Sequence, residues 1–200
     1  SMSRVERRLT VGLLALEGAM LSSLTGPTDL LRIAQTLAEV RDPGARLRLE
    51  TVLVGARGQG QVHDASGLAI GPVVSPDLAL DLLLVPGYLH TSASDAFHRV
   101  AGYGPEMELL RAMHLRGVPL VANCCSALLL AEAGLLDGHQ ATTSWWLDGV
   151  FRQRYPRVRL DVERMVVEDG GVTTTGASTA VMSFMLQWIG RAIGPELAQL

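Results

Sequence analysis

Two adjacent cysteines, Cys124 and Cys125, stand where this sequence could do chemistry. They directly follow the apolar run 118–123 and precede a run of small and apolar residues at 126–134. A buried strand that turns straight into a helix presents the residue at the turn on the edge of the sheet, as a nucleophile elbow does. The first N–H groups of the helix would lower the pKa of a thiol there, or bind an anion without covalent chemistry. Alternatively, both thiols are small core groups, a common role of free cysteine.

A thiolate nucleophile also needs a base, and the sequence has five histidines. Only His90, which follows the apolar run 80–86, is expected to reach the same sheet edge as Cys124. The other four are expected at the surface. A disulfide between neighbouring residues is strained and rare, so the pair does not predict a disulfide framework. A redox or electrophile sensor that uses Cys124 and Cys125 remains a third hypothesis.

The elements that must position these residues are short apolar runs alternating with longer amphipathic runs. The first four buried strands are predicted at 9–16, 49–54, 80–86 and 118–123, with helices at 27–40, 105–116 and 125–134. Strands that are almost continuously apolar are typical of a parallel sheet covered on both faces. The alternation of strands and helices therefore predicts a doubly wound α/β fold.

The last third of the sequence has a different pattern. Runs 158–167 and 171–175 flank Glu-Asp-Gly-Gly at 168–171, which predicts a hairpin. A long helix is expected at 177–193. The sequence ends at Leu200 within a helical pattern and without a turn signal, which favours one domain taken from a longer protein.

Composition limits the classes of function. The sequence is 48% hydrophobic and 18% charged, with a formal net charge of -3, and 200 residues predict one domain. An acidic balance argues against a domain that binds nucleic acid or an anionic membrane by itself. The apolar run 177–189 contains Ser178, Ser183 and Gln187 and is shorter than the roughly 20 residues of a membrane span. We therefore expect a cytoplasmic protein with no membrane segment.

The segment 121–138, VANCCSALLLAEAGLLDG, followed by ATTSW at 141–145, resembles the ThiJ/PfpI superfamily. Within it, the similarity is to the class I glutamine-amidotransferase-like domain at the N-terminus of many AraC-type transcription regulators, and it extends over nearly the whole chain. This resemblance implies a flavodoxin-like three-layer sandwich that spans 1–200 as a homodimer. It also implies a helix-turn-helix DNA-binding domain after Leu200, which this chain lacks.

The departures from that family pattern bear on catalysis. The resemblance places Cys124 at the elbow, but Ser23 stands where catalytic relatives have an acid and Ser144 where they have a histidine. Ser183 stands where an aspartate often opens the last helix. General acid–base help is worth about 10²–10⁴-fold in rate, and hydroxyls do not supply it at neutral pH. These three serines favour a site retained for binding.

We therefore predict the ligand-sensing, dimerising domain of an AraC-type regulator, without catalysis, cofactor or metal. Its effector is expected to be a small neutral or weakly anionic molecule that accepts hydrogen bonds from the N–H groups of Gly87 and Cys125. The regulator is expected to bind DNA only through the absent domain. The predicted site residues are Ser23, Gly87, Tyr88, Cys124, Cys125, Ser144 and Trp145. Trp145 and Trp146 are alternatively core residues. The alternative function is an isonitrile-hydratase-like or amidase-like enzyme with Cys124 as nucleophile and His90 as base.

Overall fold

A computed structural model describes residues 6–44 and 46–194 of the chain. Its centre is a six-stranded sheet in the order β2-β1-β5-β6-β10-β9, parallel except for the edge strand β9. The strands are β1 (Arg7–Leu14), β2 (Leu47–Val54), β5 (Leu82–Val85), β6 (Leu120–Ala122), β9 (Val166–Asp169) and β10 (Val172–Thr175). Two-stranded pairings join β3 (Val62–His63) to β4 (Ala69–Ile70), and β7 (Gln140–Ala141) to β8 (Arg159–Leu160).

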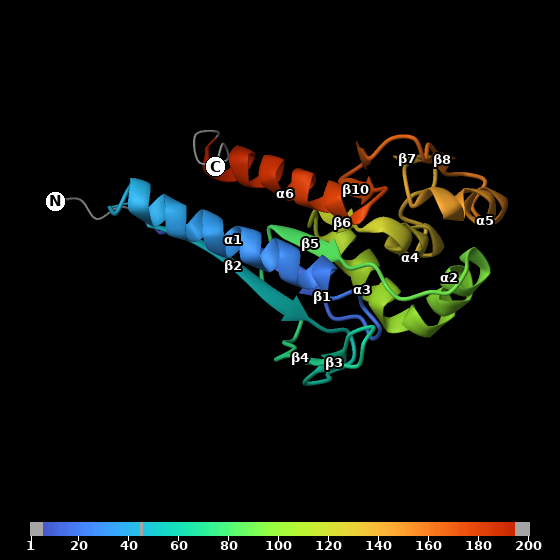
Figure 1. Ribbon diagram of the computed structural model, residues 1–200, viewed down its shortest axis with the longest axis horizontal. Helices are drawn as coiled ribbons and strands as arrows, with labels where there is room; N and C mark the ends of the chain where they lie inside the picture. Colours follow the sequence, from blue (N-terminus) through green and yellow to red (C-terminus); the bar gives the residue numbers. More distant parts are fainter. Residues whose placement is uncertain (1–5, 45, 195–200) are drawn as a thin grey trace.

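Helices cover the sheet, and α1 and α6 lie side by side along it (Figure 1). The α-helices are α1 (Ser22–Arg41), α2 (Ala93–Arg99), α3 (Gly104–Leu115), α4 (Ala127–Glu132), α5 (Asp148–Arg154) and α6 (Ser178–Ile193). Short 3-10 helices are η1 (Val100–Tyr103), η2 (Cys124–Ser126) and η3 (Trp145–Leu147). None of the helices in the described ranges is both long and apolar enough to cross a bilayer.

The core lies on both faces of the sheet. All four residues of the central strand β5 are fully buried, which explains why its sequence is continuously apolar. The predicted doubly wound, flavodoxin-like sandwich is confirmed. The chain runs from β1 outward to β2 and then returns to β5 on the other side of β1. Carboxyl ends of strands at such a reversal form the crevice where α/β sheets bind ligands.

Most of the predicted elements are present with shifted ends. The helix predicted at 27–40 begins at Ser22, so Pro27 lies inside α1 and not at its start. The strand predicted at 158–167 was wrong: it is split into β8 and β9 by a turn in which Asp161 Oδ1 accepts a hydrogen bond from the Glu163 N–H at 3.1 Å. The hairpin of β9 and β10 is confirmed. The helical pattern noted up to Leu200 lies outside the described residues beyond Gly194.

Candidate functional site

The predicted elbow is present at Cys124. Strand β6 ends at Ala122, and Cys124 has φ 53°, the only positive φ of a non-glycine residue in the part of the chain that the structure describes. Such a left-handed conformation costs about 1–2 kcal/mol. Neighbouring threonines hold it, because the Cys124 N–H donates to Thr175 Oγ1 at 3.4 Å and Thr143 Oγ1 donates to the Cys124 carbonyl at 2.9 Å. Hydrogen bonds to the backbone of Cys124 thus stabilise this strained conformation.

Asn123 connects the elbow to the residue at the acid position. Its buried amide donates from Nδ2 to Ser23 Oγ at 2.7 Å. Its Oδ1 accepts from the Cys124 thiol at 3.2 Å and from Thr175 Oγ1 at 3.3 Å. Ser23 and Cys124, 101 positions apart in the sequence (124 − 23), therefore belong to one polar network. Sequence reasoning missed Asn123 and Thr175; the one available indication was a polar residue at the end of a buried strand.

The Cys124 thiol is held in its neutral form. Burial raises its pKa, and the hydroxyls of Ser178 and Ser144 only partly oppose that shift. The Asn123 carbonyl oxygen adds to this, because it can accept a proton from a thiol but repels a thiolate. The expectation that helix N–H groups lower this pKa is therefore wrong. The thiol hydrogen-bonds toward Asn123 and Ser178, and α4 behind it has only six residues.

Ser144, which the resemblance predicts to replace a catalytic histidine, is fully buried. Its hydroxyl has no hydrogen-bond partner, alone among the buried side-chain N and O atoms of the described residues. It is close enough to Cys124 to favour the thiolate slightly. An unsatisfied buried hydroxyl costs about 1–3 kcal/mol, which a polar ligand group could recover. Ser144 therefore offers a vacant hydrogen bond next to the elbow.

Three of the predicted site residues have groups that are engaged within the protein. The Gly87 N–H, predicted to bind a ligand, donates instead to Ser23 Oγ at 3.3 Å. Tyr88 is 1% exposed, and its hydroxyl donates to the Ala96 carbonyl. The Cys125 thiol is clamped on the Tyr88 backbone, accepting from its N–H at 3.4 Å and donating to its carbonyl at 3.5 Å. Burial raises the Cys125 pKa to about 12, so this thiol is a core group behind the elbow.

An exposed aromatic cluster follows Ser144 in the chain. Trp145 is 73% exposed and Trp146 is 45% exposed, so the alternative that they are core residues is wrong. Trp146 Nε1 donates to His90 Nε2 at 2.9 Å, and the two rings stack. His90 Nδ1 lies 3.0 Å from the Tyr88 carbonyl oxygen, an acceptor, so Nδ1 carries the proton. Trp145 stays a predicted ligand contact beside this cluster.

Among the residues that the structure describes, no histidine or carboxylate is hydrogen-bonded to the Cys124 thiol. Within the described ranges, the hydrogen bonds of this thiol go to Asn123 and Ser178, and both ring nitrogens of His90 have other partners. The same ranges hold no cluster of three His, Cys, Asp or Glu that suits a metal ion. The network of Ser23, Asn123 and Cys124 is neutral, and its chemistry is hydrogen bonding. It lies where β1, β5 and β6 end, beside the reversal of strand order between β1 and β5.

Comparison with known proteins agrees with this fold. The pattern of the DJ-1/PfpI family matches residues 11–191. The HTH-type transcriptional regulator GbdR of Pseudomonas aeruginosa is 31% identical over 192 residues, covering 94% of this chain and 48% of GbdR. The isonitrile hydratase of Pseudomonas putida is 28% identical over 201 residues, covering 96% of this chain and 75% of the hydratase.

Among solved structures, an AraC family transcriptional regulator from Pseudomonas putida superposes with a TM-score of 0.71 at 24% identity. The superposition covers 96% of both chains. At that identity the likeness concerns the fold. This chain spans less than half the length of GbdR.

Proposed function

This chain belongs to the DJ-1/PfpI family, and from that premise we propose that it is the ligand-sensing domain of an AraC-type transcriptional regulator. The ligand is a small, neutral or weakly anionic molecule that binds at the Cys124 elbow without being turned over. DNA is bound by another part of the regulator, and the sensing domain works as a homodimer. The similarity to GbdR over 94% of this chain supports the regulatory role.

One observation carries the proposal: the elbow is surrounded by neutral hydrogen-bonding groups. The Cys124 thiol donates to an amide oxygen and its pKa is raised, so little thiolate forms near pH 7. The unpartnered hydroxyl of Ser144 lies where a proton carrier would stand in an enzyme. Such a site can recognise a polar group but has no acid or base with which to activate water or a nucleophile.

A second candidate is an isonitrile-hydratase-like or amidase-like enzyme, favoured by the 28% identity to the Pseudomonas putida hydratase. It would use Cys124 as nucleophile. Turnover of isonitriles, amides or glyoxals by the purified chain, abolished in Cys124→Ser, would establish this enzyme and remove the sensor proposal.

The sensor proposal is tested by ligand binding. The purified chain is screened by thermal shift against neutral amides, alcohols and short carboxylates, and hits are measured by calorimetry. We expect a hit whose affinity falls about tenfold or more in Ser144→Ala, which removes the vacant hydrogen bond. The matched control is Ser94→Ala, which removes an exposed hydroxyl on α2 and should leave binding unchanged. A hit that Ser144→Ala does not weaken would contradict the proposed site.

Sedimentation tests the dimer. Interfaces of stable dimers bury about 1,200 Å² or more, so a homodimer should persist at micromolar concentration. A monomer under those conditions would remove the dimer from the proposal.

A further inference from the structure

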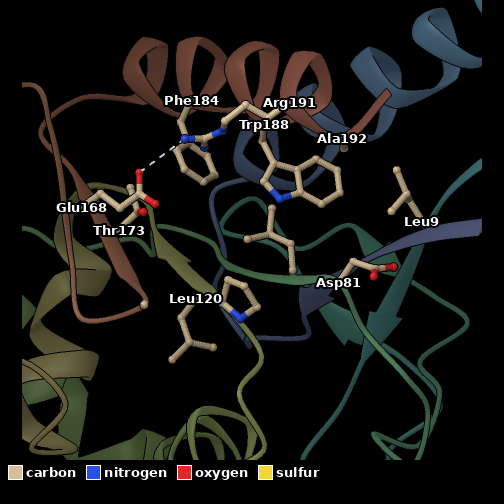
Figure 2. A pocket seen from close by; sticks show the side chains of 12 residues that line it. Leu9, Asp81, Leu120, Glu168, Thr173, Phe184, Trp188, Arg191 and Ala192 are labelled. Carbon is tan, nitrogen blue, oxygen red and sulfur yellow. Dashed lines mark ion pairs between the residues drawn. The ribbon is translucent and has the colours of Figure 1, made fainter. Parts of the chain in front are cut away.

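A second cavity lies at the opposite edge of the sheet, where β5 and β6 begin and α6 covers them. Its volume is about 420 Å³, within the range of small-molecule pockets. Figure 2 shows Phe184 and Trp188 of α6 on one side of it, facing Leu120 at the start of β6. Cys124 lies beyond the other end of β6, so this cavity is separate from the elbow site.

A threonine hydroxyl lines this cavity. Thr173 of β10 is 3% exposed, and within the described residues its side chain makes no hydrogen bond. The neighbouring Thr174 hydroxyl, in contrast, accepts from the Thr142 N–H at 2.9 Å. Unlike the enclosed hydroxyl of Ser144, the Thr173 hydroxyl is open to the cavity. It can therefore hydrogen-bond to a polar group of a ligand there.

The charged residues at the cavity indicate which sign of charge a ligand should carry. Two carboxylates, Asp81 and Glu168, and one guanidinium, Arg191, line it. Arg191 Nη1 lies 3.9 Å from Glu168 Oε2, so these two charges largely offset each other. Asp81 Oδ2 accepts the Thr10 N–H at 2.8 Å, while Oδ1 has no partner among the described groups. The remaining negative charge is that of Asp81.

We propose that this cavity is a second ligand site that takes a protonated amine with an apolar body the size of an aromatic ring. The ammonium group pairs with Asp81, and the ring packs on Leu82, Phe184 and Trp188. Figure 2 places Thr173 and Asp81 on different sides of the cavity, so a hydroxyl at the far end of the ligand meets Thr173. This site is independent of the function proposed for the elbow.

Four matched probes test the proposal by calorimetry: phenethylamine, tyramine, 2-phenylethanol and 3-phenylpropionate. Both amines should bind at millimolar or lower concentration, and the anion should bind at least about tenfold more weakly. Asp81→Asn keeps an acceptor for the Thr10 N–H, and it should weaken phenethylamine about tenfold while leaving 2-phenylethanol unchanged. Thr173→Val should weaken tyramine but not phenethylamine.

Location is checked by fluorescence and by blocking the cavity. The sequence has three tryptophans, so the Trp145→Phe/Trp146→Phe variant reports on Trp188 alone. Amine binding should change that emission, and Ala192→Trp, which fills the cavity, should abolish binding. Ser144→Ala should bind the amines as the parent does, which separates this site from the elbow. Absence of saturable amine binding, equal binding of the anion, or no effect of Asp81→Asn would each overturn the proposal.

Discussion

The left-handed backbone at Cys124 can be tested by comparing two substitutions that both remove the thiol. Cys124→Ala and Cys124→Gly each lose the hydrogen bond to Asn123 Oδ1 and the contact with Ser178. They differ mainly in that glycine adopts φ 53° without strain, whereas alanine keeps its Cβ there. The difference between them therefore measures the strain at position 124.

We expect the free energy of unfolding of Cys124→Gly to exceed that of Cys124→Ala by about 1 kcal/mol. A left-handed residue with a Cβ costs about 1–2 kcal/mol, and the greater freedom of glycine in the unfolded chain returns about 0.4–1 kcal/mol of that. At ordinary helix or strand positions the order is reversed, and glycine is less stable than alanine. For a chain of this size, 1 kcal/mol corresponds to a Tm difference of about 2–4 °C.

Urea unfolding followed by circular dichroism gives both free energies, and calorimetry gives both Tm values. As a matched control, the same pair of substitutions at Ser94 in α2 should show the ordinary order, alanine above glycine. If Cys124→Ala were as stable as Cys124→Gly or more so, the elbow would carry no backbone strain. The hydrogen bonds from Thr143 and Thr175 to the Cys124 backbone would then not be needed to stabilise a strained conformation.

Three further predictions concern buried polar groups. Ser144→Ala should raise the free energy of unfolding by about 1 kcal/mol, because it removes an unpartnered buried hydroxyl; a loss of stability in urea would show that Ser144 is bonded. The unfolded Cys125 thiol releases its proton above pH 9.0, whereas burial delays release in the folded chain to about pH 12. Stability should therefore fall with rising pH in that window, by about 1.4 kcal/mol per pH unit from this group. Cys125→Ala should show a shallower slope in urea titrations above pH 9, and an equal slope would contradict the burial of the thiol. Arg57 Nη2 lies 2.6 Å from Oε1 of Glu106, whose side chain is only 1% exposed. Arg57→Met should cost about 2 kcal/mol of unfolding free energy because it leaves Glu106 buried and unpaired, a value reduced because Arg57 is 45% exposed. Adding Glu106→Gln should restore part of that loss, and full stability of Arg57→Met alone would show that the pair contributes nothing.

The sequence predicted the sheet and the elbow because their information is local. Continuous apolar runs identify buried strands, and the abutment of 118–123 with the cysteines identifies the turn. The resemblance located Ser23 and Ser144, but neither it nor the pattern foresaw Asn123 as the group that joins Ser23 to Cys124. That role depends on a side-chain contact between the segment after β6 and the start of α1, which are 100 positions apart in the sequence. The same holds for the Gly87 N–H, whose bond to Ser23 joins the segment after β5 to the start of α1.

Local pattern also failed where a single polar side chain redirects the backbone. The run 158–167 has the apolar content of one strand, yet Asp161 closes a turn within it. The cavity under α6 was not foreseen, because its lining comes from the starts of strands and the end of a helix that are distant in the sequence.

The elbow has a consequence for how reactivity can be gained at this position. Its backbone shape is fixed by Thr143 and Thr175, which bond to the carbonyl and N–H of Cys124, while the acidity of its thiol is governed by burial, Asn123 and the nearby hydroxyls. Thr175 belongs to both sets, because its hydroxyl also donates to Asn123 Oδ1 at 3.3 Å. The side chain at position 124 can therefore be exchanged while the turn persists, whereas a change at Asn123 also affects a residue that supports the turn. An acid at position 23 and an imidazole at position 144 would restore the groups that catalytic relatives carry, but Ser23 is 3% and Ser144 0% exposed, so the surrounding packing would have to make room for them.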